Sequence, residues 1–352
     1  MRRHDQFQRQ GWWYFALAAL ACAALLAGCV AATPARSSTA QRTPHAPITA
    51  TAVSGGAAGL VNRPVPSTGC AQASPVAPGS SGDLSVAVAP ATNEGATTRS
   101  YRVHVPVGYT SDQPTPLLLV FHGFGGTGAG MESLSGFSSL ADQQRFLAVY
   151  PRGLPFGSGG AAFWASLGPS DFGVDDALFT SVLLDALQRQ FCVDPQRIYA
   201  TGFSNGGAMA GFLACELTGR IAAFAPVSGN FYAIGGGCHP VRPAPILDFH
   251  GTADPILPYD GIPASENPAW PLPPIVSWLA AWAGRDGCAV GPTVILRETS
   301  VFGEQWTSCQ GGATVVHYRI EGGGHAWPPV IAGQSPASVI WRFFQAHPLP
   351  AS

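Results

Sequence analysis

Short apolar runs recur along the chain from about residue 100 onward, and stretches with helical spacing lie between many of them. The runs that predict strands are Tyr101–Val105, Leu117–Phe121, Phe146–Tyr150, Arg197–Thr201, Ala222–Val227, Ile246–His250 and Val315–Ile320. The run Leu117–Phe121 is apolar at every position, which is typical of a strand buried on both faces of a parallel sheet.

Helical periodicity is clearest in residues 174–191, where Leu178, Val182, Leu183 and Leu187 recur on one helical face. Similar patterns predict helices over Met131–Arg145, Asn205–Glu216, Ile275–Ala283 and Ser335–Ala346. Strands that alternate with helices indicate an α/β domain whose mostly parallel central sheet is flanked by helices on both faces. Functional side chains in such sheets gather where the strands end.

The N-terminal residues have the pattern of an export signal. In residues 1–29, three arginines precede an apolar stretch from Trp12 to Ala27, which is typical of a signal peptide or, alternatively, of an uncleaved anchor. Its end, Leu25–Cys29, resembles a bacterial lipobox, so we expect Cys29 to be lipidated and to anchor the protein in the membrane. The alternative is a plain signal peptide cleaved shortly after Cys29.

Residues 30–85 are rich in Ala, Thr, Pro, Ser and Gly and have few large apolar side chains. Such a segment buries too little surface to offset its ordering entropy, so we predict a flexible tether. Residues 86–352 are then one catalytic domain, exported either to the cell envelope or beyond it. Charged residues make up 11% of the chain and the net charge is −2, so a nucleic acid partner is not expected.

Six of the eight cysteines lie outside the signal and the lipobox. An even number of cysteines in an exported chain indicates disulfides, although six allow 15 pairings. We favour Cys288–Cys309, which closes a short loop ahead of the C-terminal histidines, followed by Cys215–Cys238 and Cys70–Cys192. No spacing typical of a zinc site is present, so no metal is expected.

Ser204 is the candidate nucleophile, because Gly202–Gly206 reads G-x-S-x-G between a predicted strand and a predicted helix. This strand–turn–helix context is the one in which a nucleophile elbow exposes a serine hydroxyl on a sharp turn. A serine hydroxyl is a weak nucleophile until a base removes its proton, so a histidine is required. His325 is the best placed, on a glycine loop that follows the last predicted strand.

Asp254 is the candidate acid, since it follows the strand Ile246–His250 and lies between Ser204 and His325 in the chain. It would hold the imidazole in the correct tautomer. The alternatives are Asp248, which lies inside the strand, and Asp260. An Asp254 that only begins the turn before Pro255 is also compatible with the pattern.

The loop after Leu117–Phe121 reads His122-Gly123-Phe124-Gly125-Gly126 and is the candidate oxyanion loop. Its expected donors are the backbone amides of Phe124 and of Asn205. Trp164, Trp270 and Trp327 are candidates for a substrate-binding wall, and packing in the core is the alternative for each. Asp175 and Asp176 are expected to cap the helix that follows them.

These motifs together resemble the secreted polyhydroxybutyrate depolymerase / feruloyl esterase family of α/β hydrolases. The matching segments are Leu119–Gly123, Val174–Asp176, Val193–Gly207, Phe249–Asp254 and Gly322–Pro328. The resemblance implies the α/β-hydrolase fold, a Ser204–Asp254–His325 triad, and ester hydrolysis without a metal or organic cofactor. Substrates in this family include hydroxyalkanoate polyesters, feruloyl-type aromatic esters and short-chain esters.

Three functions therefore remain open at this point. The first is a serine esterase that works through an acyl-enzyme on small or polymeric ester substrates. The second is an envelope acyltransferase that uses the same triad and passes the acyl group to an alcohol. The third is a non-catalytic surface binding module. We expect the protein to be a monomer.

Overall fold

The computed structural model describes residues 61–88, 98–156, 160–168, 173–235, 237–328 and 330–350. All of these belong to one unit, residues 52–352. The predicted signal peptide and Cys29 lie outside the described residues, as does most of the predicted tether. Within the described ranges, none of the helices combines the length and the apolar character needed to cross a bilayer.

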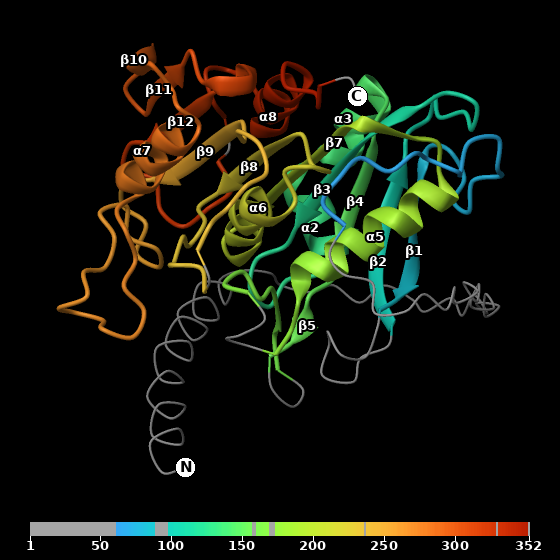
Figure 1. Ribbon diagram of the computed structural model, residues 1–352, viewed down its shortest axis with the longest axis horizontal. Helices are drawn as coiled ribbons and strands as arrows, with labels where there is room; N and C mark the ends of the chain where they lie inside the picture. Colours follow the sequence, from blue (N-terminus) through green and yellow to red (C-terminus); the bar gives the residue numbers. More distant parts are fainter. Residues whose placement is uncertain are drawn as a thin grey trace, which may run out of the picture. The chain divides into compact units, whose positions relative to one another are not determined.

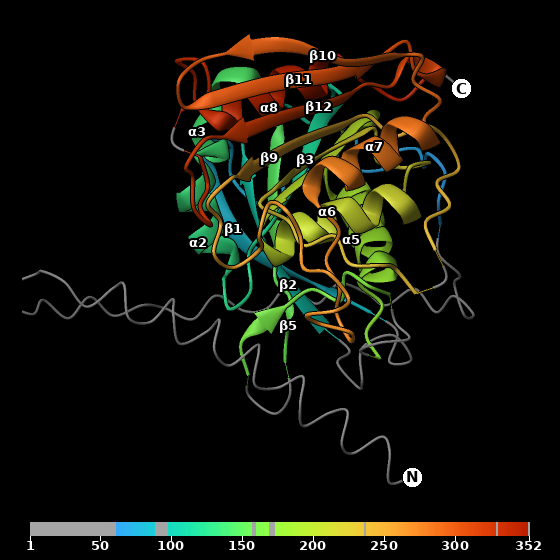
Figure 2. The same cartoon turned by 90° about the vertical axis from the view of Figure 1, so that its left-hand side faces the viewer.

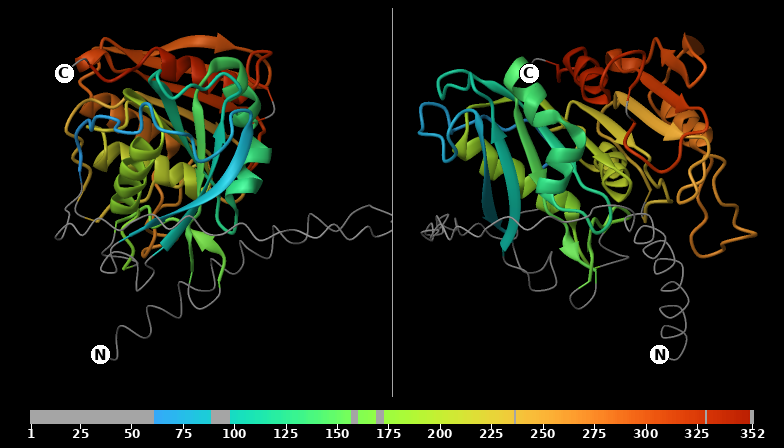
Figure 3. Two further views of the ribbon diagram at one scale, coloured as in Figure 1. Left: turned by 90° about the vertical axis from the view of Figure 1, so that its right-hand side faces the viewer. Right: turned by 180° about the vertical axis from the view of Figure 1, so that it is seen from behind.

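A ten-stranded sheet forms the centre of the domain (Figure 1). Its spatial order is β1 (Ser80–Ala87), β2 (Thr98–Val105), β4 (Leu147–Pro151), β3 (Thr115–Phe121), β7 (Val193–Phe203), β8 (Ala223–Val227), β9 (Ile246–Gly251), β12 (Val315–Ile320), β11 (Val301–Thr307) and β10 (Val290–Arg297). The six strands from β4 to β12 are parallel to one another. The two strands at each end pair antiparallel, with β1 at one edge (Figure 3) and β10 at the other.

Six described helices cover the two faces of this sheet (Figures 1 and 2). One face carries α5 (Asp176–Gln190), α6 (Asn205–Glu216) and α7 (Ile275–Arg285), and the other carries α2 (Gly128–Ser135), α3 (Phe137–Gln144) and α8 (Pro336–Gln345). In β3, Leu117 and Leu119 belong to the first core cluster, whereas Leu118 belongs to the second. The strand is therefore buried on both faces, and the predicted α/β architecture is confirmed.

Each of the seven predicted strands is present, but two features differ from the expectation. The segment Met131–Arg145 is not one helix, because Gly136 adopts a left-handed conformation (φ 71°) that ends α2 and precedes α3. The strands β10 and β11 at this edge were not predicted: the residues of β10 are almost all exposed, and those of β11 are only partly buried. A small second sheet pairs β5 (Leu154–Pro155) with β6 (Ala162–Phe163).

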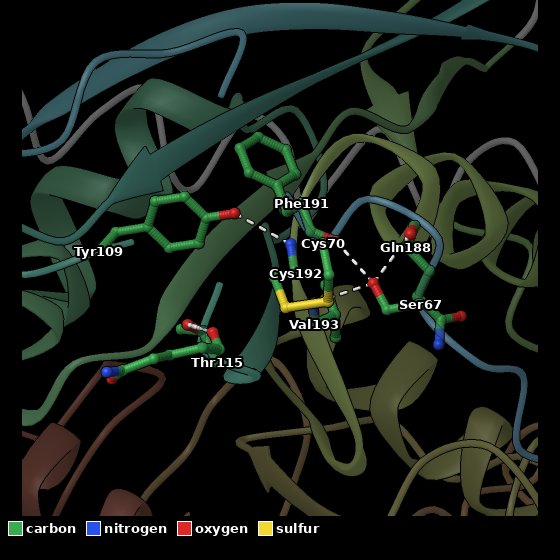
Figure 4. Close-up of a disulfide and its surroundings, with 9 residues drawn as sticks. Ser67, Cys70, Tyr109, Thr115, Gln188, Phe191, Cys192 and Val193 are labelled. Atoms are coloured by element: carbon green, nitrogen blue, oxygen red, sulfur yellow. Dashed lines mark hydrogen bonds between the residues drawn. A yellow bond between two sulfur atoms is a disulfide. The ribbon is translucent and has the colours of Figure 1, made fainter. Parts of the chain in front are cut away.

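The domain begins earlier than predicted, because residues 61–85 are part of the fold and not of a tether. Residues 80–87 form β1, which pairs along its whole length with β2. Ahead of β1, Ser67 Oγ lies 2.7 Å from the carbonyl of Phe191 and accepts the N–H of Val193 at 3.1 Å (Figure 4). The composition of the segment did not predict these contacts, because they are made by backbone groups and small polar side chains and not by large apolar ones.

Three disulfides are present, and they are the three predicted pairs: Cys70–Cys192, Cys215–Cys238 and Cys288–Cys309. Figure 4 shows the first of them joining the N-terminal segment to the chain just before β7. Around it, Thr115 donates its N–H to the carbonyl of Cys192 at 2.8 Å, and Cys192 donates its N–H to the phenol oxygen of Tyr109 at 2.9 Å. Three disulfides are typical of a protein that folds in an oxidising compartment.

Replacing Cys70 and Cys192 together by alanine is expected to lower the free energy of unfolding by about 5 kcal/mol, because the bond closes a loop between residues 122 positions apart. The matched control replaces Cys288 and Cys309, which are only 21 positions apart. By the logarithmic dependence on loop length, that loss should be smaller by about 1.5 kcal/mol. Urea unfolding of the two double variants measures the difference, and equal losses would contradict the loop-length argument.

Candidate active site

Ser204 lies at the junction of β7 and α6 in a strained backbone conformation, with φ 57° and ψ −122°. Its neighbours must be glycines. A Cβ atom on Gly206 would lie 2.2 Å from the carbonyl oxygen of Phe121, and one on Gly202 would lie 2.3 Å from the carbonyl oxygen of Gly206. The G-x-S-x-G pattern is therefore required by close backbone packing, and the turn has the geometry of a nucleophile elbow.

The structure brings Ser204, His325 and Asp254 into one hydrogen-bonded line. The Ser204 hydroxyl lies 2.8 Å from His325 Nε2, and His325 Nδ1 lies 2.7 Å from Asp254 Oδ2. His325 comes from the glycine loop after β12, and Asp254 from the loop after β9. Because both strands are parallel to β7, all three loops emerge at the same end of the sheet, as the sequence pattern predicted.

Both carboxylate oxygens of Asp254 accept hydrogen bonds. Its Oδ1 accepts the backbone N–H groups of Ile256 and Leu257, each at 2.8 Å, while its Oδ2 faces His325. Burial alone raises the pKa of this carboxyl, but the bond from His325 and the two backbone amides outweigh it, so the net pKa is lowered. The group is therefore an anion at neutral pH and accepts the imidazole N–H.

Two buried histidines support the loop that carries Asp254. His250 donates from Nε2 to the carbonyl of Leu257 at 2.8 Å, and His317 Nε2 lies 2.9 Å from the hydroxyl of Tyr259. The other nitrogen of His317 faces Asp248 at 2.9 Å. Asp248, one of the alternative acids, is thus paired with His317 and not with His325. The other alternative, Asp260, lies exposed on the surface.

The loop after β3 lies directly beside Ser204. A Cβ atom on Gly123 would lie 3.3 Å from the Cβ of Ser204, so the loop and the elbow are in contact. The N–H of Gly126 bonds to the carbonyl of Gly123 at 2.9 Å, and that of Gly125 bonds to Ala162 at 2.7 Å. The loop that contains Phe124 is therefore fixed by its own backbone and by β6.

Asn205, the second expected oxyanion donor, begins α6, so its N–H is one of those that the helix itself leaves without an intrahelical acceptor. Its side chain has a different task that the sequence did not indicate. Asn205 Oδ1 accepts the N–H of Trp164 at 2.7 Å, and its Nδ2 donates to the carbonyl of Trp164 at 3.0 Å. The amide therefore ties the elbow to the strand segment at β6.

Trp164 is not part of a substrate-binding wall, because its side chain is only 1% exposed. Its indole N–H donates to the carbonyl of His122 at 2.9 Å, and its ring packs edge-on against Phe121. The predicted substrate contact is therefore wrong for Trp164, which is a core residue packed behind the loop that follows β3. Trp327, two residues after His325, is half-buried and packs edge-on against Phe137. Trp270, also half-buried, packs against Tyr232.

The buried side chain of His122 holds the loop in place, a role that the sequence did not indicate. Its Nδ1–H donates to the carbonyl of Gly123 at 2.7 Å, and its Nε2 accepts the N–H of Gly153 at 3.1 Å. This pattern needs a neutral ring. Burial lowers the pKa of His122 to about 4, although the bond to Gly123 opposes the shift.

A measurable pH dependence of stability follows from this buried histidine. The folded-state pKa lies below the value of about 6.5 in an unfolded chain, so the unfolded state binds the proton first as the pH falls. His122 should therefore contribute fully above pH 6.5 and lose about 3 kcal/mol of stability between pH 6.5 and 4. Urea unfolding of His122→Gln should show a shallower decline over this range. The exposed His239→Gln control should match the parent protein.

Among the described residues, no group of three His, Cys, Asp or Glu side chains is arranged to hold a metal ion. The site consists of a hydroxyl, an imidazole, a carboxylate and backbone amides at the end of a parallel sheet. Such a set can deprotonate a hydroxyl nucleophile and can place amide donors near a developing oxyanion.

Comparison with known proteins finds relatives that are named as esterases. The chain is 32% identical to feruloyl esterase B from Piromyces equi over 261 residues, which make up 72% of this chain and 46% of that relative. The chain thus spans less than half the length of this relative. It is 33% identical over 250 residues to "Putative esterase NocK" from Nocardia uniformis, and the match covers 66% of this chain and 71% of that protein.

A third relative, feruloyl esterase C from Emericella nidulans, is 29% identical over 257 residues, or 70% of this chain and 84% of the relative. No family model matches the sequence. Among solved structures, an acetyl xylan esterase from Aspergillus awamori superposes with a TM-score of 0.55 at 16% identity, over 75% of this chain and 99% of that one. At this level of identity, the likeness shows that the fold is shared.

Proposed function

Because this chain belongs to the feruloyl esterase-like family of α/β hydrolases, we propose that it hydrolyses carboxylic esters through an acyl-enzyme on Ser204. The observation that carries the proposal is the line from Ser204 Oγ through His325 to Asp254, with separations of 2.8 and 2.7 Å. These distances allow both proton transfer and control of the tautomer.

In the first half of the reaction, the Ser204 oxygen attacks the ester carbonyl while its proton passes to His325 Nε2. The carbonyl oxygen becomes an oxyanion, to which the backbone amides of Phe124 and Asn205 donate. Asp254 accepts the Nδ1–H and stabilises the imidazolium. His325 then gives its proton to the leaving alcohol oxygen, the carbon–oxygen bond breaks, and an acyl-serine remains.

Water resolves the intermediate in the second half. His325 takes one proton from water, the hydroxide oxygen adds to the acyl carbon, and the carboxylic acid leaves as Ser204 recovers its proton. The names of the relatives favour aromatic acyl groups of the feruloyl type over short-chain and hydroxyalkanoate esters as substrates. The membrane anchor at Cys29 remains part of this proposal, as a means of keeping the enzyme at the cell envelope.

The test is hydrolysis by the purified protein of methyl ferulate, p-nitrophenyl acetate, butyrate and octanoate, and 3-hydroxybutyrate oligomers. We expect turnover that depends on Ser204 and is highest for methyl ferulate. A maximum on another ester would keep the esterase and change its acyl class. If turnover occurs only when an alcohol acceptor is added, the protein is an acyltransferase. No turnover and no labelling by a fluorophosphonate would contradict a catalytic role.

A further inference from the structure

The two aspartates at the start of α5 have different partners. Asp175 is the N-cap of the helix, because its side chain accepts the N–H of Leu178 at 2.8 Å. Asp176, the first residue of α5, is 1% exposed, and its carboxylate is bonded to Arg99 and to the main chain of Ala165. The capping hydrogen bond predicted for this pair is therefore made by Asp175, and the side chain of Asp176 has a separate role that capping does not explain.

The carboxylate of Asp176 has one partner on each oxygen. Its Oδ1 pairs with Arg99 Nη1 at 2.5 Å, and neither side chain is more than 1% exposed. Its Oδ2 accepts the backbone N–H of Ala165 at 2.7 Å. Arg99 is held in turn, because its Nη2 donates to the carbonyl of Arg152 at 3.1 Å and its guanidinium lies 3.7 Å from the ring centre of Phe179. A buried ion pair with all these partners keeps Ala165 at a fixed place, since any movement would break charge-assisted hydrogen bonds.

Residues 162–165, here called the connecting segment, contact both parts of the chain that carry the expected oxyanion donors. On one side the segment is bonded to the loop after β3. It accepts the N–H of Gly125 at 2.7 Å, and the indole N–H of Trp164 donates to the carbonyl of His122 at 2.9 Å. On the other side, the Asn205 side chain is bonded to both backbone groups of Trp164, at 2.7 and 3.0 Å. The position of the connecting segment therefore determines how the loop and the elbow lie relative to each other.

From these contacts we infer that Asp176 is a positioning residue for the oxyanion hole. Its carboxylate and Arg99 fix the connecting segment, and the connecting segment fixes the backbone amides of Phe124 and Asn205. The inference rests on the function proposed for Ser204, because it concerns the donors of that reaction. Such donors accelerate a reaction only when they are aligned before it begins, and a misplacement of about 1 Å can lower turnover about 10²-fold.

Asp176→Asn is expected to break one of the two bonds whichever way the new amide turns. Asparagine has a single acceptor oxygen, whereas Arg99 and the N–H of Ala165 are both donors. The charge of Arg99 favours the oxygen on its side, so the NH₂ group faces the N–H of Ala165 and the connecting segment is released. We expect kcat to fall by about 10- to 100-fold while KM changes less than about twofold, because the oxyanion forms only in the transition state.

The matched control is Asp185→Asn, in the same helix. Asp185 pairs with the buried Arg220 at 2.8 Å, but it lies about 13.5 Å further along the axis of α5. Both variants take a carboxylate charge away from a buried arginine, so both should lower the melting temperature. Only Asp176→Asn should lower kcat. An equal kcat in the two variants would mean that Asp176 stabilises the fold and does not position the donors.

Asn205→Ala tests the same connection from its other end and decides the question if Asp176→Asn does not fold. It removes both bonds to Trp164 but keeps the backbone N–H of residue 205, and the lost side chain is only half-buried. We expect kcat to fall at least about tenfold with little change in KM. Because both substitutions act through the connecting segment, the double variant should lose less than the product of the two single losses.

Each variant is measured as the purified full-length protein in two assays, initial rates with p-nitrophenyl butyrate and the inhibition constant Ki of phenylboronic acid. A boronate adds to a serine hydroxyl as a tetrahedral anion, so its Ki depends on the oxyanion donors whereas KM does not. A Ki that rises as kcat falls in Asp176→Asn and Asn205→Ala, but not in Asp185→Asn, supports the inference. Unchanged kcat and Ki in Asn205→Ala, or the same changes in Asp185→Asn, would overturn it.

The proposed function and this inference fail in different ways. A parent protein that neither hydrolyses esters nor reacts with a fluorophosphonate at Ser204 would contradict both. An active parent protein whose turnover depends on Ser204, together with Asp176→Asn and Asn205→Ala variants of full activity, would overturn the positioning role alone.

Discussion

Ser204→Ala is expected to lower turnover of an activated ester by on the order of 10⁶, because the nucleophile is lost while the fold is kept. An alanine can adopt the same strained backbone conformation. It also keeps the main-chain hydrogen bond in which the N–H of residue 204 donates to the carbonyl of Val227 at 2.9 Å. The substitution therefore removes only the oxygen that faces His325. Initial rates with p-nitrophenyl acetate measure the loss.

Two controls make this result specific. Ser300→Ala, at an exposed position whose side chain is not part of the line from Ser204 to Asp254, should keep full activity. A fluorophosphonate should label the parent protein and the Ser300 variant but not the Ser204 variant. If purified Ser204→Ala protein kept more than about one per cent of the activity, another nucleophile would be at work and the elbow would have only a structural role.

The sequence was most informative where chemistry imposes strict spacing. The elbow glycines are needed because a side chain at Gly202 or Gly206 would collide with backbone carbonyls, and such a requirement is visible in a single chain. The continuous apolar runs of the parallel strands are equally direct consequences of burial on both faces. The three favoured cysteine pairs are the ones that form, although the sequence by itself left 15 pairings open.

Other features could not be predicted from the sequence, because they depend on contacts between groups that lie far apart along the chain. The segment before β1 has the composition of a linker, yet Ser67 and Cys70 fasten it to the residues beside Cys192. The exposed strand β10 is held by pairing with β11 rather than by burial. Trp164 is aromatic and its backbone is hydrogen-bonded to the Asn205 side chain next to Ser204, but its ring is buried in the core. Which side a tryptophan faces depends on packing that a sequence pattern does not specify.

Asp254→Asn is expected to lower turnover by about 10⁴ without unfolding the protein. The reason is that the two carboxylate oxygens of Asp254 have different hydrogen-bond partners. Its Oδ1 accepts the N–H groups of Ile256 and Leu257, so the oxygen of an asparagine must stay on that side to avoid placing donors against donors. The amide nitrogen is then directed at His325 Nδ1.

An amide N–H at this position requires Nδ1 to be an acceptor, so the proton of the neutral imidazole moves to Nε2. That nitrogen lies 2.8 Å from the Ser204 hydroxyl and can no longer accept its proton. The ¹⁵N chemical shifts of the imidazole of His325 should report this change of tautomer together with the loss of turnover. Asp260→Asn, an exposed position in the same loop, should change neither. A loss of less than tenfold, or an unchanged tautomer, would mean that Asp254 holds its loop but does not orient the base.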